Sequence, residues 1–234
     1  YYKKALDSYH KSLSMHELQN NNSGVADSLS NIGIIYYRKT NLEKSLNYHK
    51  RALLIKEKIG NKIDIATSLA NIGTIYYSKL EFEEAIKFYQ KSLRILKQIG
   101  GKVAMGGVLN NIGLIYNDKA EYDNALSYYA ESLSVQEKLG DKLGMSCCLV
   151  NIGNTHASKG DYNNAIKFYK KGLNIDKDLD NRDGIAISMN NIGSLNAEKG
   201  DLEKAMHYFE SSLSIREDLA DNHGIACSLL NIAD

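Results

Sequence analysis

The stretch Asn111-Ile112-Gly113-Leu114-Ile115-Tyr116 decides the fold, because its first three residues recur every 40 residues along the chain. Asn-Ile-Gly begins at positions 31, 71, 111, 151 and 191, and Asn231-Ile232-Ala233 is a sixth, altered copy. A constant period between about 20 and 50 residues is the sequence signature of a stacked repeat array. The chain is therefore expected to be a repeat protein that presents an extended surface.

Each period contains two helical patterns and no strand pattern. Over residues 104–119, the apolar positions from Val108 to Tyr116 recur at steps of three and four, which is typical of one face of an α-helix. A break follows at Ala120-Glu121, and a second helix is expected over residues 122–139. The equivalent breaks include Gly160-Asp161, in which Gly ends one helix and Asp can cap the next.

Applied to the whole chain, this pattern predicts an all-α solenoid of stacked helix hairpins with about twelve helices. We expect a single solenoid over residues 1–234. It consists of a partial repeat 1–23, repeats 24–63, 64–103, 104–143, 144–183 and 184–223, and a partial repeat 224–234. A finished solenoid carries polar capping helices, and neither end has one, so the chain is expected to be a fragment of a longer protein.

Recurring small and large residues indicate how the hairpins pack. Glycine inside a helix costs about 1 kcal/mol relative to alanine, so a repeated helical glycine is expected where a neighbouring side chain needs its space. Two aromatic columns are the expected neighbours: Tyr36, Tyr76 and Tyr116, and Tyr89, Tyr129, Tyr169 and Phe209. His49 stands in the second column and is expected to be a core substitute for tyrosine.

Composition excludes several classes of function. A net charge of +1 without a basic block gives no reason to expect nucleic-acid binding, and no apolar run reaches the roughly 18 residues of a membrane helix. The three cysteines form no CxxC pair, and we expect them to be small helix residues in a reducing, cytoplasmic compartment. No catalytic arrangement remains once the repeat columns are set aside, so neither enzyme activity nor a cofactor nor a metal is expected.

The spacing of a recurring set of residues resembles the tetratricopeptide repeat over the entire chain; in one unit the set is Leu109, Ile112-Gly113, Tyr116, Tyr122, Ala125 and Tyr129. The 40-residue period is similar to that of the Pins/LGN-type adaptors and the kinesin light chains. It also resembles regulatory arrays attached to histidine kinases, nucleotide cyclases and caspase-like proteases. The resemblance implies a right-handed superhelix whose first helices line a concave groove for a peptide or protein partner.

The asparagine column is the sharpest candidate for a binding site. Asparagine is a mediocre helix former, and its amide can match both the N–H and the C=O of a peptide unit. In O-GlcNAc transferase, which the Asn-Ile-Gly pattern resembles, equivalent asparagines form a ladder along the groove. We expect a similar grip on the backbone of an extended partner, with selectivity from neighbouring polar residues. The column comprises Asn31, Asn71, Asn111, Asn151, Asn191 and Asn231, and the neighbours are Asn110, Asn190, Asn154 and Asn117.

The alternatives remain open at this point. Each asparagine could instead bond the neighbouring repeat and fix the stack. The main functional expectation is a non-catalytic scaffold that binds a protein or peptide partner. A second is the regulatory region of a larger signalling enzyme, and a third is a structural element that self-associates head to tail through uncapped terminal helices.

Overall fold

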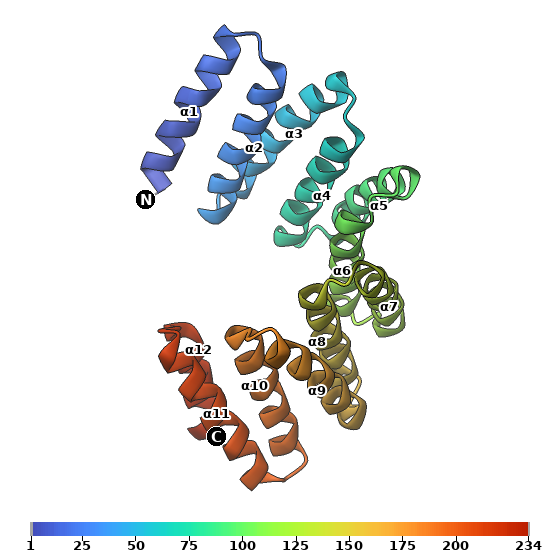
Figure 1. Ribbon diagram of the computed structural model, residues 1–234, viewed down its shortest axis with the longest axis vertical. Helices are drawn as coiled ribbons and strands as arrows, with labels where there is room; N and C mark the ends of the chain where they lie inside the picture. Colours follow the sequence, from blue (N-terminus) through green and yellow to red (C-terminus); the bar gives the residue numbers. More distant parts are fainter. Residues whose placement is uncertain (1, 234) are drawn as a thin grey trace. The chain divides into compact units, whose positions relative to one another are not determined.

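The computed structural model describes residues 2–233, and within them the chain forms twelve α-helices and no strand (Figure 1). The helices are α1 (Tyr2–Leu18), α2 (Asn22–Arg38), α3 (Leu42–Ile59), α4 (Lys62–Ser78), α5 (Phe82–Ile99), α6 (Lys102–Asp118), α7 (Tyr122–Leu139), α8 (Lys142–Ser158), α9 (Tyr162–Asp178), α10 (Arg182–Glu198), α11 (Leu202–Asp218) and α12 (Asn222–Ala233). The prediction of stacked helix hairpins with about twelve helices is confirmed.

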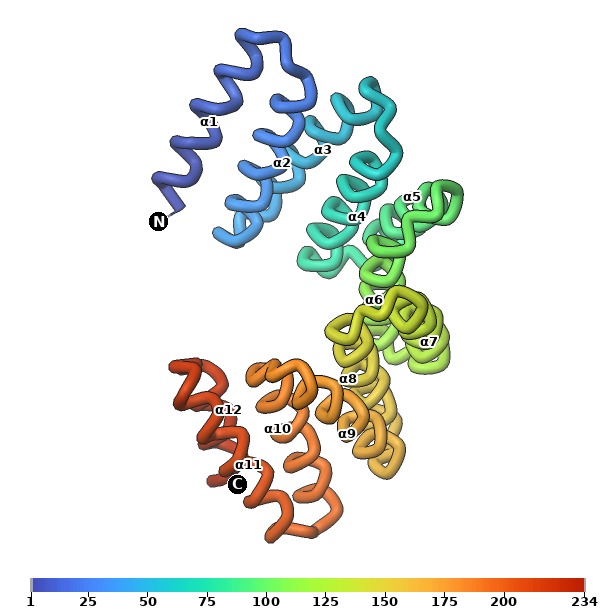
Figure 2. Tube along the Cα trace, viewed as in Figure 1, coloured from blue at the N-terminus to red at the C-terminus, as the bar shows by residue number. Residues whose placement is uncertain are grey.

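The chain divides into two compact units, residues 1–115 and 116–234. In the first unit, α1 to α5 follow one another as antiparallel neighbours joined by short turns (Figure 2). In the second unit, α8 to α12 do the same. The boundary falls inside α6, the helix that carries Asn111.

The helix ends follow from capping chemistry. Asn or Asp precedes most helices, and its side-chain oxygen accepts a hydrogen bond from a backbone N–H in the first turn, as Asp161 does from Asn164 at 3.2 Å. Glycines with positive φ, such as Gly60 and Gly160, close many of the helices. The expected helix over 122–139 is confirmed, while the one expected over 104–119 begins two residues earlier and ends one residue earlier.

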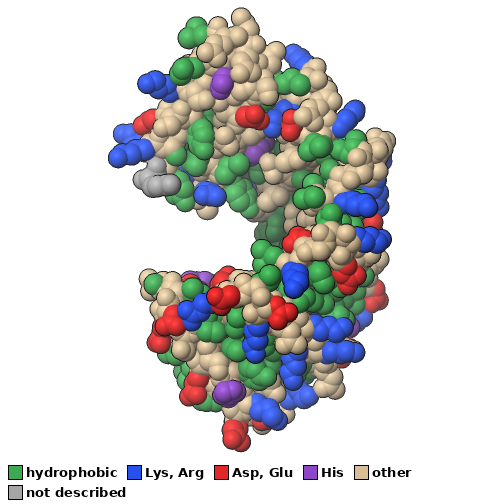
Figure 3. Space-filling view, viewed as in Figure 1, with side chains coloured by type: hydrophobic (Ala, Val, Ile, Leu, Met, Phe, Trp, Pro, Cys, Tyr) green, Lys and Arg blue, Asp and Glu red, His purple; other side chains and the backbone are tan. Residues whose placement is uncertain are grey.

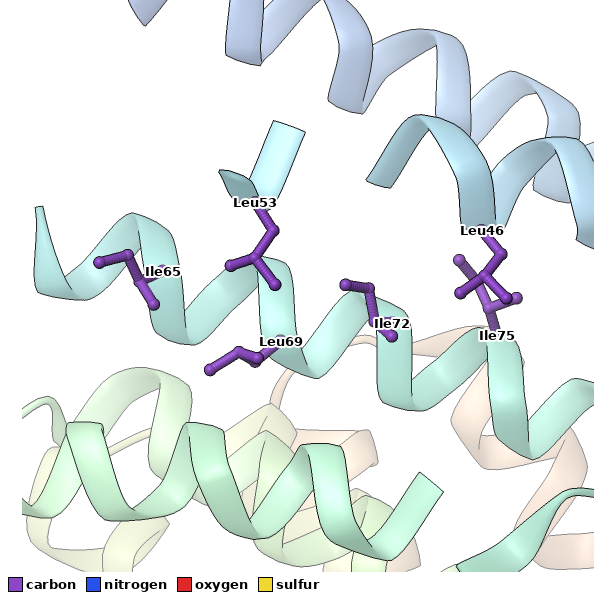
Figure 4. Packing of buried hydrophobic residues seen from close by; sticks show 6 residues of the cluster. All are labelled: Leu46, Leu53, Ile65, Leu69, Ile72 and Ile75. Carbon is purple, nitrogen blue, oxygen red and sulfur yellow. The ribbon is translucent and has the colours of Figure 1, made fainter. Parts of the chain in front are cut away.

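The core of each unit lies between the helices of successive hairpins. In the first unit, Leu46 and Leu53 of α3 point toward Ile65, Leu69, Ile72 and Ile75 of α4 (Figure 4). A cluster in the second unit joins α9 and α10 in the same way. Burial of a side chain of this size contributes about 1.5–3 kcal/mol relative to exposure, so these clusters are the main source of cohesion between hairpins.

The helical glycines make room for one aromatic column and not for both. A Cβ atom added to Gly73 would lie 2.9 Å from the ring of Tyr89, and one added to Gly153 would lie 2.6 Å from the ring of Tyr169. The other aromatic column packs elsewhere: Tyr36 stacks on Tyr48 with ring centroids 5.5 Å apart. The expectation that both columns fill the glycine gap is therefore wrong for Tyr36 and its equivalents.

Across residues 2–233, no helix combines the length and the apolar character that crossing a membrane requires.

Candidate functional site

The six column asparagines lie on the first helix of each hairpin, on α2, α4, α6, α8, α10 and α12, and each is half-buried. The four neighbouring asparagines, at positions 110, 117, 154 and 190, are half-buried as well. A half-buried amide is accessible to a ligand and can also bond a neighbouring helix. Its hydrogen-bond partners therefore decide which role it can serve.

In the first unit, Asn111 bonds a tyrosine of the preceding hairpin. Tyr89 is 1% exposed, and its hydroxyl oxygen lies 2.9 Å from Thr74 Oγ1. Burial raises the pKa of Tyr89, while hydrogen bonds from Thr74 and Asn111 oppose that rise. We call such a group a hydroxyl node. It consists of a tyrosine on the second helix of a hairpin, a polar residue on the first helix of the same hairpin, and the column asparagine on the first helix of the next hairpin. The node thus joins three successive helices.

A second hydroxyl node lies in the second unit. The Tyr169 hydroxyl donates to Asn154 Oδ1 at 2.7 Å, and Asn191 Nδ2 donates to the same oxygen at 3.4 Å. Burial raises the pKa of Tyr169 to about 12. Here Asn154 and Asn191, two residues predicted from the sequence to face a ligand, are in contact with each other.

Other predicted residues also have partners inside the protein. Asn231 Nδ2 donates to Asn190 Oδ1 at 3.0 Å, and Asn117 Oδ1 accepts from the Thr155 hydroxyl at 2.9 Å. Asn110 and Asn151 likewise take part in interactions. The asparagine column therefore contributes to packing over much of its length.

Asn31 and Asn71 differ from the rest of the column. Among residues 2–233, their side-chain amides have no hydrogen-bond partner. Asn71 borders a cavity of about 150 Å³ that is lined by residues of α2, α3 and α4. The lining residues are Ile34, Tyr37, His49, Asn71, Thr74 and Ile75. We call the surface of α2 and α4 that carries Asn31 and Asn71 the open asparagine face.

Sequence reasoning missed the tyrosines of the hydroxyl nodes as partners of the asparagines. Their rings belong to the core, as expected, but the Tyr89 hydroxyl bonds Asn111 of the next hairpin and the Tyr169 hydroxyl bonds Asn154, which also bonds Asn191. A partial signal was available, because Tyr89 and Asn111 stand 22 residues apart and Tyr169 and Asn191 repeat that spacing. Tyr9 and Asn31 share the spacing as well, but no hydrogen bond joins them among the described residues. His49 and Asn71 are also 22 residues apart, but His49 stands at the tyrosine position and has no hydroxyl group to reach Asn71.

Two of the lysines near the ends of the first helices, Lys79 and Lys159, bond residues of a preceding second helix. Lys79 Nζ lies 2.8 Å from Glu43 Oε1 and 2.7 Å from Glu81 Oε1, and its hydrogen bonds to Glu43 and Glu81 raise the pKa of Lys79. Lys159 Nζ similarly lies 2.7 Å from Asp123 Oδ1. On the visible surface, charges of both signs are interspersed (Figure 3). These lysines are partnered and do not converge on a common anion site.

The described residues hold no group of three or more His, Cys, Asp or Glu side chains placed to bind a metal ion. Cys147 and Cys148 are adjacent in α8; Cys147 is exposed, whereas Cys148 is buried, and burial raises the pKa of the Cys148 thiol above its usual value. At the open asparagine face, the groups that can form hydrogen bonds with a ligand are the neutral amides of Asn31 and Asn71 and the imidazole of His49 in the adjoining cavity.

The fold and this face define a helical repeat protein. A tetratricopeptide repeat family model matches residues 24–98, 105–178 and 160–218. The chain belongs to the tetratricopeptide repeat family. No curated protein matches it significantly.

Several solved structures share the fold. BtubC from P. vanneervenii is 16% identical with a TM-score of 0.82, and the alignment covers 95% of this chain and 93% of that one. The Rap conjugation gene regulator of the plasmid pLS20, solved in complex with the Phr* peptide, is 17% identical with a TM-score of 0.74, covering 90% and 58%. A Podosopora anserina putative kinesin light chain is 11% identical with a TM-score of 0.69, covering 85% and 97%. At these identities the likeness concerns the fold alone.

Proposed function

We propose that this protein is a non-catalytic interaction scaffold that holds an extended segment of a protein partner on its open asparagine face. The observation that carries the proposal is the pair Asn31 and Asn71. Both amides are half-buried on the first helices of successive hairpins, and neither is used within the part of the chain that the structure describes.

Two adjacent amides suit the backbone of an extended segment. Packed helices lie about 8–10 Å apart, whereas an extended chain advances about 3.3 Å per residue. One asparagine can therefore serve about every third residue of the segment. Each amide can donate to a peptide C=O and accept from a peptide N–H, so the grip does not depend on the sequence of the segment.

The energetics favour a weak, reversible grip. A hydrogen bond contributes about 0.5–1.5 kcal/mol net, and the ordering of a flexible segment offsets part of that gain. Asn111 and Asn191 would have to leave their hydroxyl nodes to join the ladder, which weakens their contribution. The segment's side chains must therefore supply the remaining affinity and the selectivity.

The comparisons support the proposal at the level of fold. The chain belongs to the tetratricopeptide repeat family, and the pLS20 regulator, whose fold is similar, was solved with a peptide. The neutral amides and paired lysines of the present chain favour a backbone grip over recognition of an acidic terminus.

The test is a peptide-display selection on the purified protein, run in parallel with two double variants. Asn31→Ala/Asn71→Ala removes the open amides and is expected to leave the melting temperature within about 2 °C, because no internal hydrogen bond is lost. Asn191→Ala/Asn231→Ala is the matched control, since these amides bond Asn154 and Asn190. The wild-type protein and the control are expected to enrich the same extended segments, and the first variant is expected to lose them.

Two results would contradict the proposal. Equal enrichment by the wild-type protein and Asn31→Ala/Asn71→Ala would show that the open amides do not hold the segment. A strong fall in the melting temperature of that same variant would show that these two asparagines serve the stack.

A further inference from the structure

The cavity beside Asn71 lies where a hydroxyl node would form if a tyrosine, with its hydroxyl group, stood at position 49. Positions 34, 49 and 71 of the first unit correspond, 40 residues on, to Thr74, Tyr89 and Asn111, which form a complete node. At the earlier position the tyrosine is replaced by His49 and the threonine by Ile34. The place of the tyrosine hydroxyl is therefore open, and the cavity of about 150 Å³ lies there.

The imidazole of His49 occupies the part of the space next to Gly33 but not the outer part, which the phenol ring and hydroxyl group of a tyrosine would fill. A Cβ atom added to Gly33 would lie 2.7 Å from His49 Cδ2, much as one added to Gly73 would lie 2.9 Å from the Tyr89 ring. Both rings thus rest against the same glycine column. Because imidazole is shorter than phenol, it ends before the position that Asn71 can reach.

Polar atoms at this cavity lack partners. His49 is 2% exposed, and its ring has no hydrogen bond among the described residues; Nδ1 is enclosed by protein atoms, so Nε2 is the ring nitrogen left for a ligand. The side-chain amide of Asn71 has no internal partner either. A polar group that loses water on burial and gains no hydrogen bond is destabilising, so a ligand that supplies the missing bond gains binding free energy here.

The walls of the cavity select the size and character of that ligand. Ile34, Ile75 and the ring of Tyr37 give a mainly apolar lining, and a cavity of about this volume with apolar walls can hold a benzene ring. The Tyr37 hydroxyl is occupied by Ser78 Oγ at 2.8 Å, which leaves His49 and Asn71 as the groups open to the ligand. Burial and the positive charge of Lys56 lower the pKa of His49 to about 4, so the cavity is neutral at pH 7.

We propose that the cavity formed by Ile34, Tyr37, His49, Asn71, Thr74 and Ile75 binds a phenolic side chain, a tyrosine of the segment held by the open asparagine face. The phenol ring packs between the isoleucines, while its hydroxyl donates to the imidazole and accepts from the amide of Asn71. Serine and threonine are too small to fill the space, and phenylalanine leaves both polar groups unpaired. The assignment of this residue to a bound segment rests on the proposed function.

The experiment titrates phenol and benzene into the isotope-labelled protein and follows the His49 imidazole and the backbone amides of α2, α3 and α4 by NMR. Phenol is expected to bind at least about threefold more tightly than benzene, which corresponds to one net hydrogen bond. His49→Tyr, which supplies the tyrosine found at the equivalent positions, is expected to abolish binding of both. Asn71→Leu keeps the side-chain volume and is expected to weaken phenol about three- to tenfold and benzene by less than twofold.

The proposal is overturned if phenol at millimolar concentration leaves the His49 signals unchanged, or if His49→Tyr binds phenol as the wild-type protein does. Phenol carries no peptide backbone, so its binding tests the cavity separately from the grip by Asn31 and Asn71. In the display selection, segments with a tyrosine are expected to be enriched on the wild-type protein and not on His49→Tyr. Equal tyrosine content in both selections would also overturn the assignment.

Discussion

The hydroxyl group of Tyr169 on α9 donates a 2.7 Å hydrogen bond to the amide oxygen of Asn154 on α8, and this oxygen also accepts from Asn191 on α10. One oxygen atom thus joins three successive helices. The same columns form a complete node at Tyr89 and an open one at His49. Asn111 and Asn191 each belong to such a node, whereas Asn71 stands beside a node that no tyrosine hydroxyl completes.

Replacing Tyr169 with phenylalanine is expected to lower the free energy of unfolding by about 1 kcal/mol, because Asn154 loses a hydrogen-bond donor in a half-buried place. Urea denaturation measures the change. In an Asn154→Ala background the same replacement should cost clearly less, because the acceptor is already gone. An equal cost in both backgrounds would assign the effect to packing of the ring.

Two glycine-to-alanine variants are expected to change stability in opposite directions. Gly153→Ala places a Cβ atom 2.6 Å from the Tyr169 ring, and overpacking of this kind costs about 1–3 kcal/mol. Gly107→Ala on α6 meets no atom within 4 Å and should gain up to about 1 kcal/mol from helix propensity. Thermal melts of the two variants test the pair, and destabilisation by both would show that helical glycines matter here for another reason.

Leu80 occupies a left-handed backbone position with φ 61° and is 74% exposed. A non-glycine residue in this conformation costs about 1–2 kcal/mol, so Leu80→Gly is expected to stabilise the protein by about 0.5–1 kcal/mol after the extra freedom of glycine in the unfolded chain is subtracted. The reciprocal control is Gly160→Leu at the same repeat position, where φ is 77°. It should destabilise by about 1–2 kcal/mol. A loss of stability in Leu80→Gly would contradict the strain argument.

His49 should make the protein less stable in mild acid. Its pKa falls from 6.5 to about 4 in the folded protein, through burial first and the charge of Lys56 second. Between these pH values the unfolded chain binds the proton and the folded chain does not. The free energy of unfolding therefore falls as the pH falls through this window, by up to about 1.4 kcal/mol per pH unit.

The measurement is urea denaturation at several pH values between 4 and 7 for the wild-type protein and His49→Tyr. The stability of the wild-type protein relative to the variant is expected to fall as the pH falls, because the variant lacks the buried imidazole while the other histidines are common to both. If the free energies of unfolding of the two proteins changed in parallel with pH, His49 would bind its proton as readily in the folded state as in the unfolded state, which contradicts the prediction.

Much of the fold could be predicted from the sequence because the period repeats every packing requirement five times. The helix over 122–139 and the glycine gap beside Tyr89 both follow from column positions alone. The role of Tyr36 could not be predicted in this way, since two aromatic columns have the same helical period. Only the direction of each side chain shows that Tyr36 stacks on Tyr48.

The candidate site was less predictable for a physical reason. The sequence identifies which columns are polar, but the pairing of Asn111 with Tyr89 depends on how far a side chain reaches across to the next helix. At His49 the ring falls short, and a cavity remains that no single column reveals. The grip by the column as a whole stays a prediction, and Asn31 and Asn71 are the members at which it can be tested most directly.

The hydroxyl node also determines how such an array can acquire a new partner. A node is closed by tyrosine and opened by a shorter ring, while the leucine and isoleucine clusters that hold the hairpins together stay untouched. On the proposed function, replacing one ring in one repeat therefore adds or removes one recognition point and leaves the others in place. An array of homologous hairpins could in this way diversify its specificity repeat by repeat while the apolar clusters between the hairpins are kept.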